Sequence, residues 1–113
     1  MAQTLSSNAS MLAIRVNESL RLERASFGAK VRAARAILAL SQCEFALQVG
    51  LTQKSVHRIE QGLVEPKLRT IANIEQYWRH NGITFEDSPN GGFRLVVAAS
   101  LISASDCRIS GLN

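Results

Sequence analysis

Four polar side chains at helical spacing carry the clearest chemistry in this sequence. In the stretch QKSVHRIE, Val56 and Ile59 have the spacing of an inward helical face. The opposite face holds Gln53, Lys54, His57 and Arg58. A glutamine amide can pair with adenine through two hydrogen bonds, and a guanidinium can pair with guanine in the same way. No acidic residue interrupts this face, which therefore suits a DNA major groove, although a solvated surface helix can show a similar charged face.

A short helix precedes this one and begins at a well-marked position. Ser41 and Glu44 have the spacing of a capping box, in which each side chain accepts a hydrogen bond from an amide that the first helical turn leaves unpaired. This spacing predicts a helix over residues 42–49. Its expected inward face consists of Phe45, Ala46 and Val49. Because Ala46 is small, a second helix can cross closely there.

A glycine turn joins the two short helices. Gly50 can take a positive φ at little cost, which is the usual way for a helix to end. Thr52 can then cap a helix over residues 53–61, and Gly62 can end it. Two short helices set at a steep angle around such a turn are typical of a device that reads DNA.

Two further helices complete the predicted helical core. Apolar periodicity predicts them over residues 28–40 and 67–80, and Gly82 can end the second. The inward stripe expected for that second helix is Leu68, Ile71, Ile74 and Trp78. We therefore expect an all-α domain over residues 27–82.

The segments on either side of this core differ from it in pattern. Residues 1–26 form an N-terminal extension, in which residues 1–9 are small, polar and without a period, so that disorder is expected. Residues 10–26 are only loosely periodic and could form a helix capped by Ser10.

Beyond Gly82 the apolar residues alternate, and the turn-rich DSPNGG separates two such runs. This pattern predicts a β-hairpin over residues 83–100. An isolated hairpin is marginal in water, so a helix, the N-terminal segment or a second subunit must cover it. The apolar run Leu95–Val97 favours a dimer edge. Residues 101–113 form a C-terminal tail with no clear pattern.

Residues 28–81 resemble the Xre/Cro-like helix-turn-helix family, which includes the lambdoid phage repressors. The resemblance lies in GAKVRAARAILALSQ, then in SQxxxAxxxGxTQxSVxRIExG, and then in Pro66 followed by KLRTIANIEQYW. It is specific because the capping box, the small crossing residue, the turn glycine and the second cap all agree in register. The resemblance implies a lambda-repressor-like bundle of four to five helices.

The resemblance also implies roles for single residues. Gln42 matches a residue that binds a DNA backbone phosphate and supports the second motif helix. Lys67 matches a basic residue that contacts a phosphate or the minor groove. The residues that match those reaching bases or phosphates in the major groove are Gln53, Lys54 and Arg58. Thr52, the expected N-cap of the same helix, lies next to these residues and is included in the expected DNA-binding site. By its spacing His57 lies on the same face of the helix as these residues. The residue type at this position varies within the family, so the resemblance assigns His57 no role.

Arg35 and Glu60 match a family ion pair that joins the first core helix to the end of the second motif helix. Read from the sequence alone, the same two residues could be separate surface charges, which contribute little when they are exposed.

The composition agrees with a small domain that binds a polyanion. The chain has 113 residues and a formal net charge of +4, with a pI near 9.7. Glu44 is the only acidic residue between positions 28 and 58, so the basic excess is local. The longest apolar run is too short to span a bilayer, and no signal peptide is recognisable, so we expect a cytoplasmic protein with no membrane partner.

Other chemistry has little support in the sequence. It contains no glycine-rich phosphate loop, no HExxH and no nucleophile paired with a base, so we expect neither an enzyme nor a cofactor. Cys43 and Cys107 lie far apart without CxxC spacing, so no metal site is expected and a reducing compartment is the simpler setting. Cys43 lies in a predicted first helical turn, which can lower a thiol pKa, although a plain small residue is the simpler interpretation.

The expected function is sequence-specific regulation of transcription by a dimeric repressor bound to double-stranded DNA. The alternative is an antitoxin or another protein-interaction module on the same domain, in which residues 83–113 bind a protein partner. The two differ in whether that segment binds another protein while the helical core is on DNA.

Overall fold

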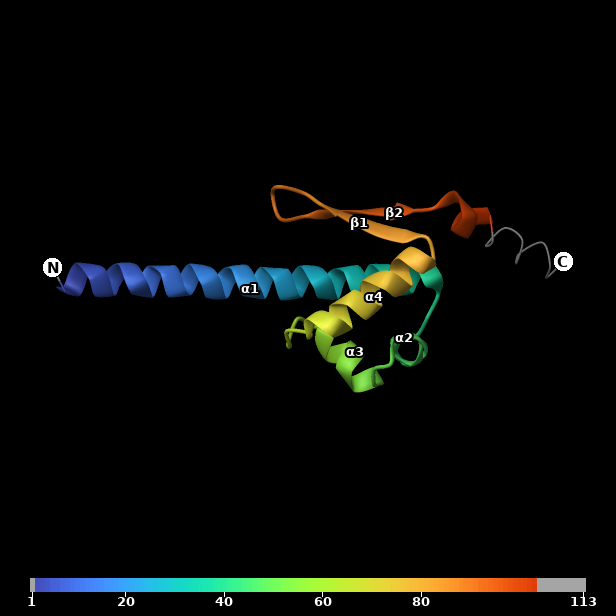
Figure 1. Ribbon diagram of the computed structural model, residues 1–113, viewed down its shortest axis with the longest axis horizontal. Helices are drawn as coiled ribbons and strands as arrows, with labels where there is room; N and C mark the ends of the chain where they lie inside the picture. The colour runs from blue at the N-terminus through green and yellow to red at the C-terminus, as the bar shows by residue number, and fades with distance from the viewer. Residues whose placement is uncertain (1, 104–113) are drawn as a thin grey trace.

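A single long helix, α1 (Ala2–Leu38), forms the N-terminal third of the chain (Figure 1). The computed structural model describes residues 2–103, with side chains from residue 9 onward. The remaining elements follow in the order α2 (Gln42–Val49), α3 (Gln53–Glu60), α4 (Leu68–His80), β1 (Ile83–Asp87) and β2 (Phe93–Val97). Residues 99–103 are also helical. The molecule is therefore a helical core with one β-hairpin.

The continuity of α1 corrects the prediction for the N-terminal segment. Residues 2–9 are helical, Ser10 lies within the helix rather than at its start, and no break separates residues 10–26 from the core helix. The physical reason is that no proline occurs before Pro66 and no glycine before Gly28. Extending a formed helix by one residue is much easier than nucleating a new one. The expectations for residues 104–113, including Cys107, lie outside the described residues.

The predicted caps of the motif helices are present. The amide of Glu44 donates to Ser41 Oγ at 3.0 Å and the amide of Ser41 donates to Glu44 Oε1 at 3.0 Å, which is the reciprocal capping box. These bonds from Ser41 hold the pKa of Glu44 below its ordinary value. Gly50 ends α2 with a φ of 72°, and Thr52 Oγ1 accepts from the amide of Ser55 at 3.1 Å.

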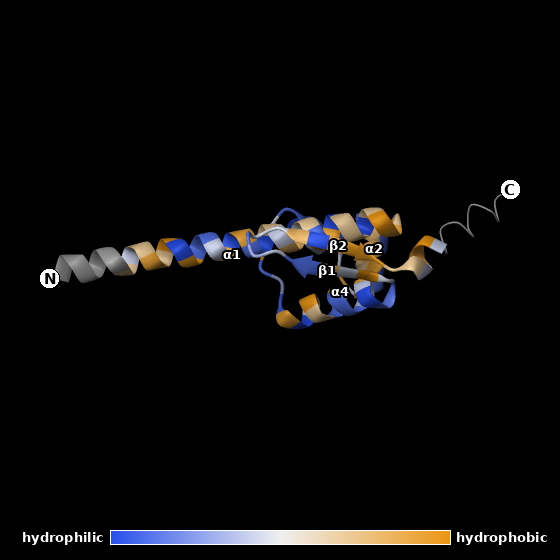
Figure 2. Cartoon of the chain, turned by 90° about the horizontal axis from the view of Figure 1, so that it is seen from above, coloured by the Kyte–Doolittle hydropathy of each residue, from blue (hydrophilic) through white to orange (hydrophobic). Residues whose placement is uncertain are grey.

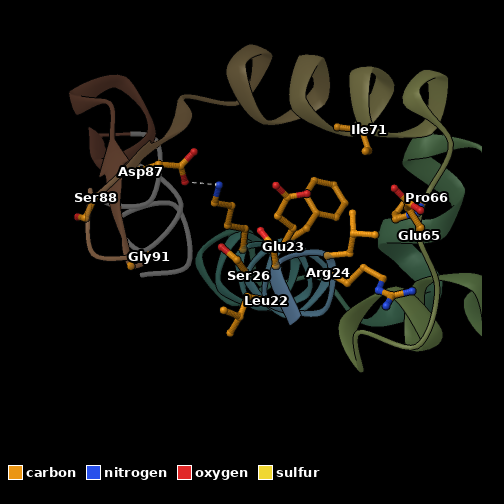
Figure 3. Close-up of a pocket in the computed structure, with 15 residues that line it drawn as sticks. Leu22, Glu23, Arg24, Ser26, Glu65, Pro66, Ile71, Asp87, Ser88 and Gly91 are labelled. Carbon is orange, nitrogen blue, oxygen red and sulfur yellow. Dashed lines mark hydrogen bonds and ion pairs between the residues drawn. The ribbon is translucent and has the colours of Figure 1, made fainter. Parts of the chain in front are cut away.

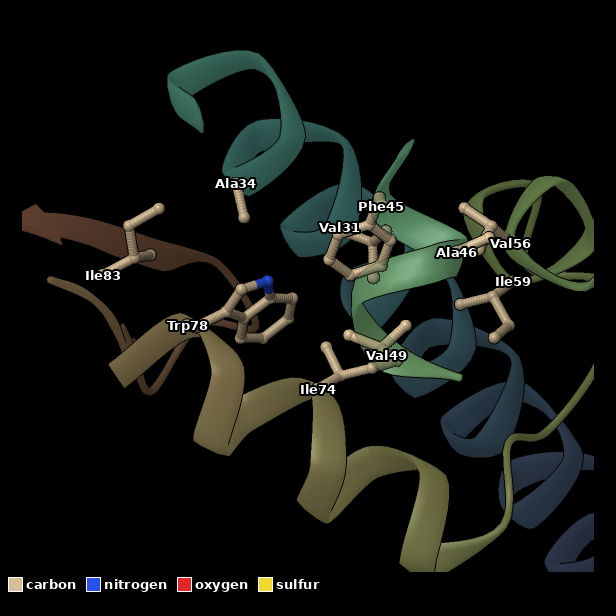
Figure 4. Packing of buried hydrophobic residues seen from close by; sticks show 10 residues of the cluster. All are labelled: Val31, Ala34, Phe45, Ala46, Val49, Val56, Ile59, Ile74, Trp78 and Ile83. Carbon is tan, nitrogen blue, oxygen red and sulfur yellow. The ribbon is translucent and has the colours of Figure 1, made fainter. Parts of the chain in front are cut away.

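The core lies where α1, α2, α3, α4 and the first strand meet (Figure 4). Its buried members are Val31, Ala34, Phe45, Ala46, Val49, Val56, Ile59, Ile74, Trp78 and Ile83. The predicted stripe of α4 is correct for Ile74 and Trp78, but Ile71 is only partly buried and Leu68 is 85% exposed. Leu68 is the first residue of α4, so it lies at the edge of the bundle where no other element covers it.

Gly28 allows α1 and α3 to touch. A Cβ at this position would lie 2.5 Å from the carbonyl oxygen of Ile59 and 2.7 Å from that of Glu60, so any larger residue would push the two helices apart. Arg32, one helical turn further along α1, donates to the carbonyl oxygen of Glu60 at 2.5 Å. A cation at the end of α3 also suits the helix dipole.

The hairpin packs on α4 through its aromatic residues. The strands are antiparallel, with Ile83 opposite Val97 and Phe85 opposite Leu95. The Phe85 ring meets Trp78 edge-on at a centroid distance of 4.8 Å. Leu95 packs against the same core, which leaves Val96 as the outward residue of the predicted dimer edge, at 42% exposure. The second strand ends at Val97 rather than at residue 100, because the chain then turns into the short helix.

Within residues 2–103, none of the helices combines the length and the apolar character that crossing a bilayer requires.

Candidate nucleic-acid interface

The two motif helices lie together on one side of α1, and the hairpin lies on the other side in the view of Figure 1. α3 begins at the Thr52 cap and buries Val56 and Ile59 against the core. This burial turns the rest of α3 outward. All four side chains predicted for its polar face are exposed, namely Gln53, Lys54, His57 and Arg58. The sequence spacing therefore gave the correct outer face of the helix.

Gln42 connects the start of α2 to the outward face of α3. Its Oε1 accepts from Gln53 Nε2 at 3.1 Å, and its own Nε2 donates to Glu60 Oε1 at 3.1 Å. Both amides are thereby oriented before any ligand arrives, and Gln53 keeps its carbonyl oxygen and one N–H for another partner. An amide held in this way presents a fixed donor and acceptor pair, which is what bidentate pairing with a base edge needs.

The ion pair expected between Arg35 and Glu60 is present and holds this network in place. Arg35 Nε donates to Glu60 Oε2 at 2.8 Å and Nη2 donates to Oε1 at 3.1 Å, a bidentate geometry. The remaining nitrogen, Nη1, donates to the carbonyl oxygen of Leu40 at 3.0 Å. Glu60 is only 2% exposed. The hydrogen bond that Arg35 donates to Glu60 raises the pKa of Arg35, so the guanidinium stays charged.

His57 lies beside Gln42 as well as on the outer face. Its Nδ1 is 3.4 Å from Gln42 Nε2, at the outer limit of a hydrogen bond. The spacing in the sequence placed His57 on the right side of the helix but did not predict this contact. The Gln42 N–H that faces it is the more weakly held of the two amide hydrogens.

Lys67 occupies the N-cap position of α4 and is exposed. Its side chain makes no capping hydrogen bond, because an ammonium group has no acceptor for the amides of the first turn. Lys54 and Arg58 are exposed cations of α3, and α3 contributes no exposed carboxylate because Glu60 is buried. The surface of α3 is therefore basic, as polyanion binding requires.

Gly28 and Arg32 belong to this site, although the sequence analysis did not assign them a role. Both contact the end of α3, as Arg35 does. The signal that could have found them is their spacing, because residues 28, 32 and 35 fall on one face of a helix.

Among residues 2–103, no three His, Cys, Asp or Glu side chains lie close enough together to hold a metal ion. The thiol of Cys43 is free and exposed in the first turn of α2.

A scan of protein families finds no model that matches this chain, and a search of curated proteins finds no significant match.

Proposed function

We propose that this protein is a sequence-specific DNA-binding regulator of transcription with a lambda-repressor-like bundle of the Xre/Cro-like family. The observation that carries the proposal is the hydrogen bond between Gln42 and Gln53, which fixes an exposed amide on a basic helix face. An ordinary surface helix gains nothing from a half-buried residue such as Gln42 that holds an exposed side chain such as Gln53 in one orientation. The Arg35–Glu60 pair and the two helix caps support the same geometry.

In the proposed mechanism, α3 enters the major groove and the protein represses transcription by occupying its operator. Gln53, Lys54 and Arg58 contact base edges or nearby phosphates. Gln42 donates to a backbone phosphate with the amide hydrogen that faces His57 in the free chain. Lys67 contacts a second phosphate and sets the position of the domain on the duplex. A homodimer would read two half-sites about 34 Å apart, one turn of the double helix.

Arg58→Ala tests the reading of bases. We expect this change to weaken binding to the selected site by roughly 1 to 3 kcal/mol and to relax the preference at one base pair per half-site. Binding to random duplex should change little, because the contact is to a base edge. Fluorescence anisotropy on selected and scrambled duplexes measures both effects. An equal loss on the two duplexes would place Arg58 on the phosphate backbone instead.

Lys67→Ala is the matched change for backbone contacts. Removal of this ammonium should weaken binding to the selected and scrambled duplexes alike, because phosphates are the same in both. The slope of log affinity against log salt should fall by about one per subunit, since one counterion fewer is released. Anisotropy titrations at several salt concentrations measure the slope, and an unchanged slope would remove Lys67 from the interface.

The rival function is a protein-interaction module, such as an antitoxin, that uses residues 83–113. It becomes the better account if the wild-type protein binds every duplex equally, including sites selected from a random pool.

A further inference from the structure

The contact between His57 and Gln42 determines which ring nitrogen of His57 carries the proton in the free chain. Gln42 Nε2 donates one hydrogen to Glu60 Oε1 at 3.1 Å, and Gln42 Oε1 accepts from Gln53 at 3.1 Å. Turning the amide over would set its oxygen against the carboxylate, so this orientation is the stable one. The second hydrogen of Gln42 Nε2 faces His57 Nδ1, at 3.4 Å between the nitrogens. Nδ1 is therefore the acceptor, and the proton of the neutral ring lies on Nε2.

DNA binding removes this hydrogen from His57. The inference rests on the proposed function, in which Gln42 donates to a backbone phosphate. Gln42 has two amide hydrogens, and Glu60 holds one of them, so the phosphate receives the one that faces His57 in the free chain. His57 Nδ1 then has no donor and lies beside a phosphate oxygen. Two acceptors that meet in this way repel each other unless one of them binds a proton.

We propose that His57 takes up a proton at Nδ1 when the protein binds DNA and then holds the same phosphate as Gln42. The proton comes from the solvent and Nε2 keeps its own, so each bound subunit gains one positive charge. An imidazolium donates from both nitrogens, and a charged donor makes a shorter and stronger hydrogen bond to phosphate than a neutral one. Because the complex binds one proton more than the free chain, DNA affinity falls as the pH rises.

The other ionisable groups near His57 come from its own helix and from the two helices packed against it. They are Lys54, Arg58 and Glu60 of α3, Cys43 and Glu44 of α2, and Arg32 and Arg35 of α1. The bidentate bonds from Arg35 oppose the charge of Glu60, and the capping bonds from Ser41 lower the pKa of Glu44. In the free chain Lys54 and Arg58 repel a further positive charge on this face, whereas the phosphates of a bound duplex attract it.

The sequence contains two histidines, His57 and His80, and histidine is the side chain that ordinarily changes charge between pH 5 and pH 8. His80 is exposed at the C-terminal end of α4, which is hydrophilic in Figure 2, and it belongs to none of the proposed DNA contacts. A second cluster of charges lines the groove of about 490 Å³ between α1, α4 and the hairpin tip (Figure 3). Its ionisable members are Glu23, Arg24, Lys30, Glu65 and Asp87. Neither histidine lies there, so mutation of His57 and of His80 separates the groups that titrate in this range.

The test is the pH dependence of DNA affinity, measured by fluorescence anisotropy on the selected duplex and on a scrambled duplex. We expect the affinity of the wild-type protein to fall about tenfold per bound subunit from pH 5 to pH 8, which is the effect of one opposite charge in contact. His57→Gln keeps a hydrogen-bond donor but has no group that titrates, so it should abolish this dependence. His80→Gln is the matched control and should keep the dependence of the wild type.

The salt dependence of binding separates proton uptake from a simple change of tautomer. At pH 5 the slope of log affinity against log salt should be steeper than at pH 8 by about one per subunit, because the imidazolium releases one counterion more. A neutral ring that only moved its proton from Nε2 to Nδ1 could still donate to the phosphate, but the slope would then be the same at both pH values. His57→Gln should show one slope at both pH values.

Phosphates occur in every duplex, so the pH dependence should appear on the scrambled duplex as well as on the selected one. A failure of this inference is therefore distinct from a failure of sequence-specific reading. Circular dichroism at both pH values verifies that each variant keeps its helices. A wild-type affinity that does not change with pH, a dependence that His57→Gln retains or one that His80→Gln removes would each overturn the inference.

Discussion

Glu60→Ala is expected to destabilise the fold by about 3 kcal/mol. The carboxylate is 2% exposed and accepts hydrogen bonds from Arg35 and from Gln42. Its removal leaves the partly buried guanidinium of Arg35 without an opposite charge and takes away the acceptor that orients Gln42. Urea denaturation measures the loss in the free energy of unfolding. Glu75→Ala, an exposed carboxylate on α4, is the control and should change stability by less than about 0.5 kcal/mol.

The double variant separates the pair from its surroundings. If Arg35 and Glu60 act together, replacing both by alanine should cost clearly less than the sum of the two single losses. The second replacement then removes a charge that the first has already left unpaired. Strictly additive losses would contradict the coupling that the bidentate geometry implies.

Trp78→Ala should cost more, roughly 3 to 5 kcal/mol, because it removes the largest side chain of the core. Trp78 is 3% exposed, and its ring packs between Phe27 of α1 and Phe85 of the hairpin at centroid distances of 5.7 and 4.8 Å. It therefore joins three elements that have no other common residue among the ring contacts of the described chain. Thermal or urea unfolding followed by circular dichroism measures the effect.

Trp78→Phe is the informative comparison. The indole Nε1 is buried and has no hydrogen-bond partner in the described part of the chain, so the tryptophan carries the cost of an unpaired donor. Phenylalanine keeps much of the ring contact and removes that donor. The loss should be well under half of that for alanine, and equal losses would show that ring packing is not what Trp78 contributes.

The sequence predicted the motif helices well because their ends are determined locally. The Ser41 and Thr52 caps and the Gly50 turn depend on residues three or four positions apart, and the structure has all three. The outward direction of Gln53 and Arg58 follows from the buried spacing of Val56 and Ile59 on the same helix. The hairpin was predictable for a similar reason, since DSPNGG separates two short alternating runs.

Other features depend on contacts between distant residues. The close approach of Gly28 to the end of α3 joins positions about thirty residues apart, and no local pattern shows it. The link from Glu60 through Gln42 to Gln53 likewise requires three separate helix termini to meet. The helix expected over residues 10–26 is present, but its start at Ser10 and the disorder expected before it were wrong, because a helix can extend from a packed segment into one that is only weakly amphipathic.

Selection of bound fragments from a pool of random duplex DNA tests the central claim most directly. We predict recovery of a two-fold symmetric site whose half-sites lie about one helical turn apart and contain a guanine that Arg58→Ala no longer prefers. A two-fold symmetric site would indicate that the protein binds as a dimer. A guanine whose preference depends on Arg58 would indicate that α3 lies in the major groove. A pool that shows no enriched sequence after repeated rounds, with equal affinity for every duplex, would contradict sequence-specific regulation by this protein.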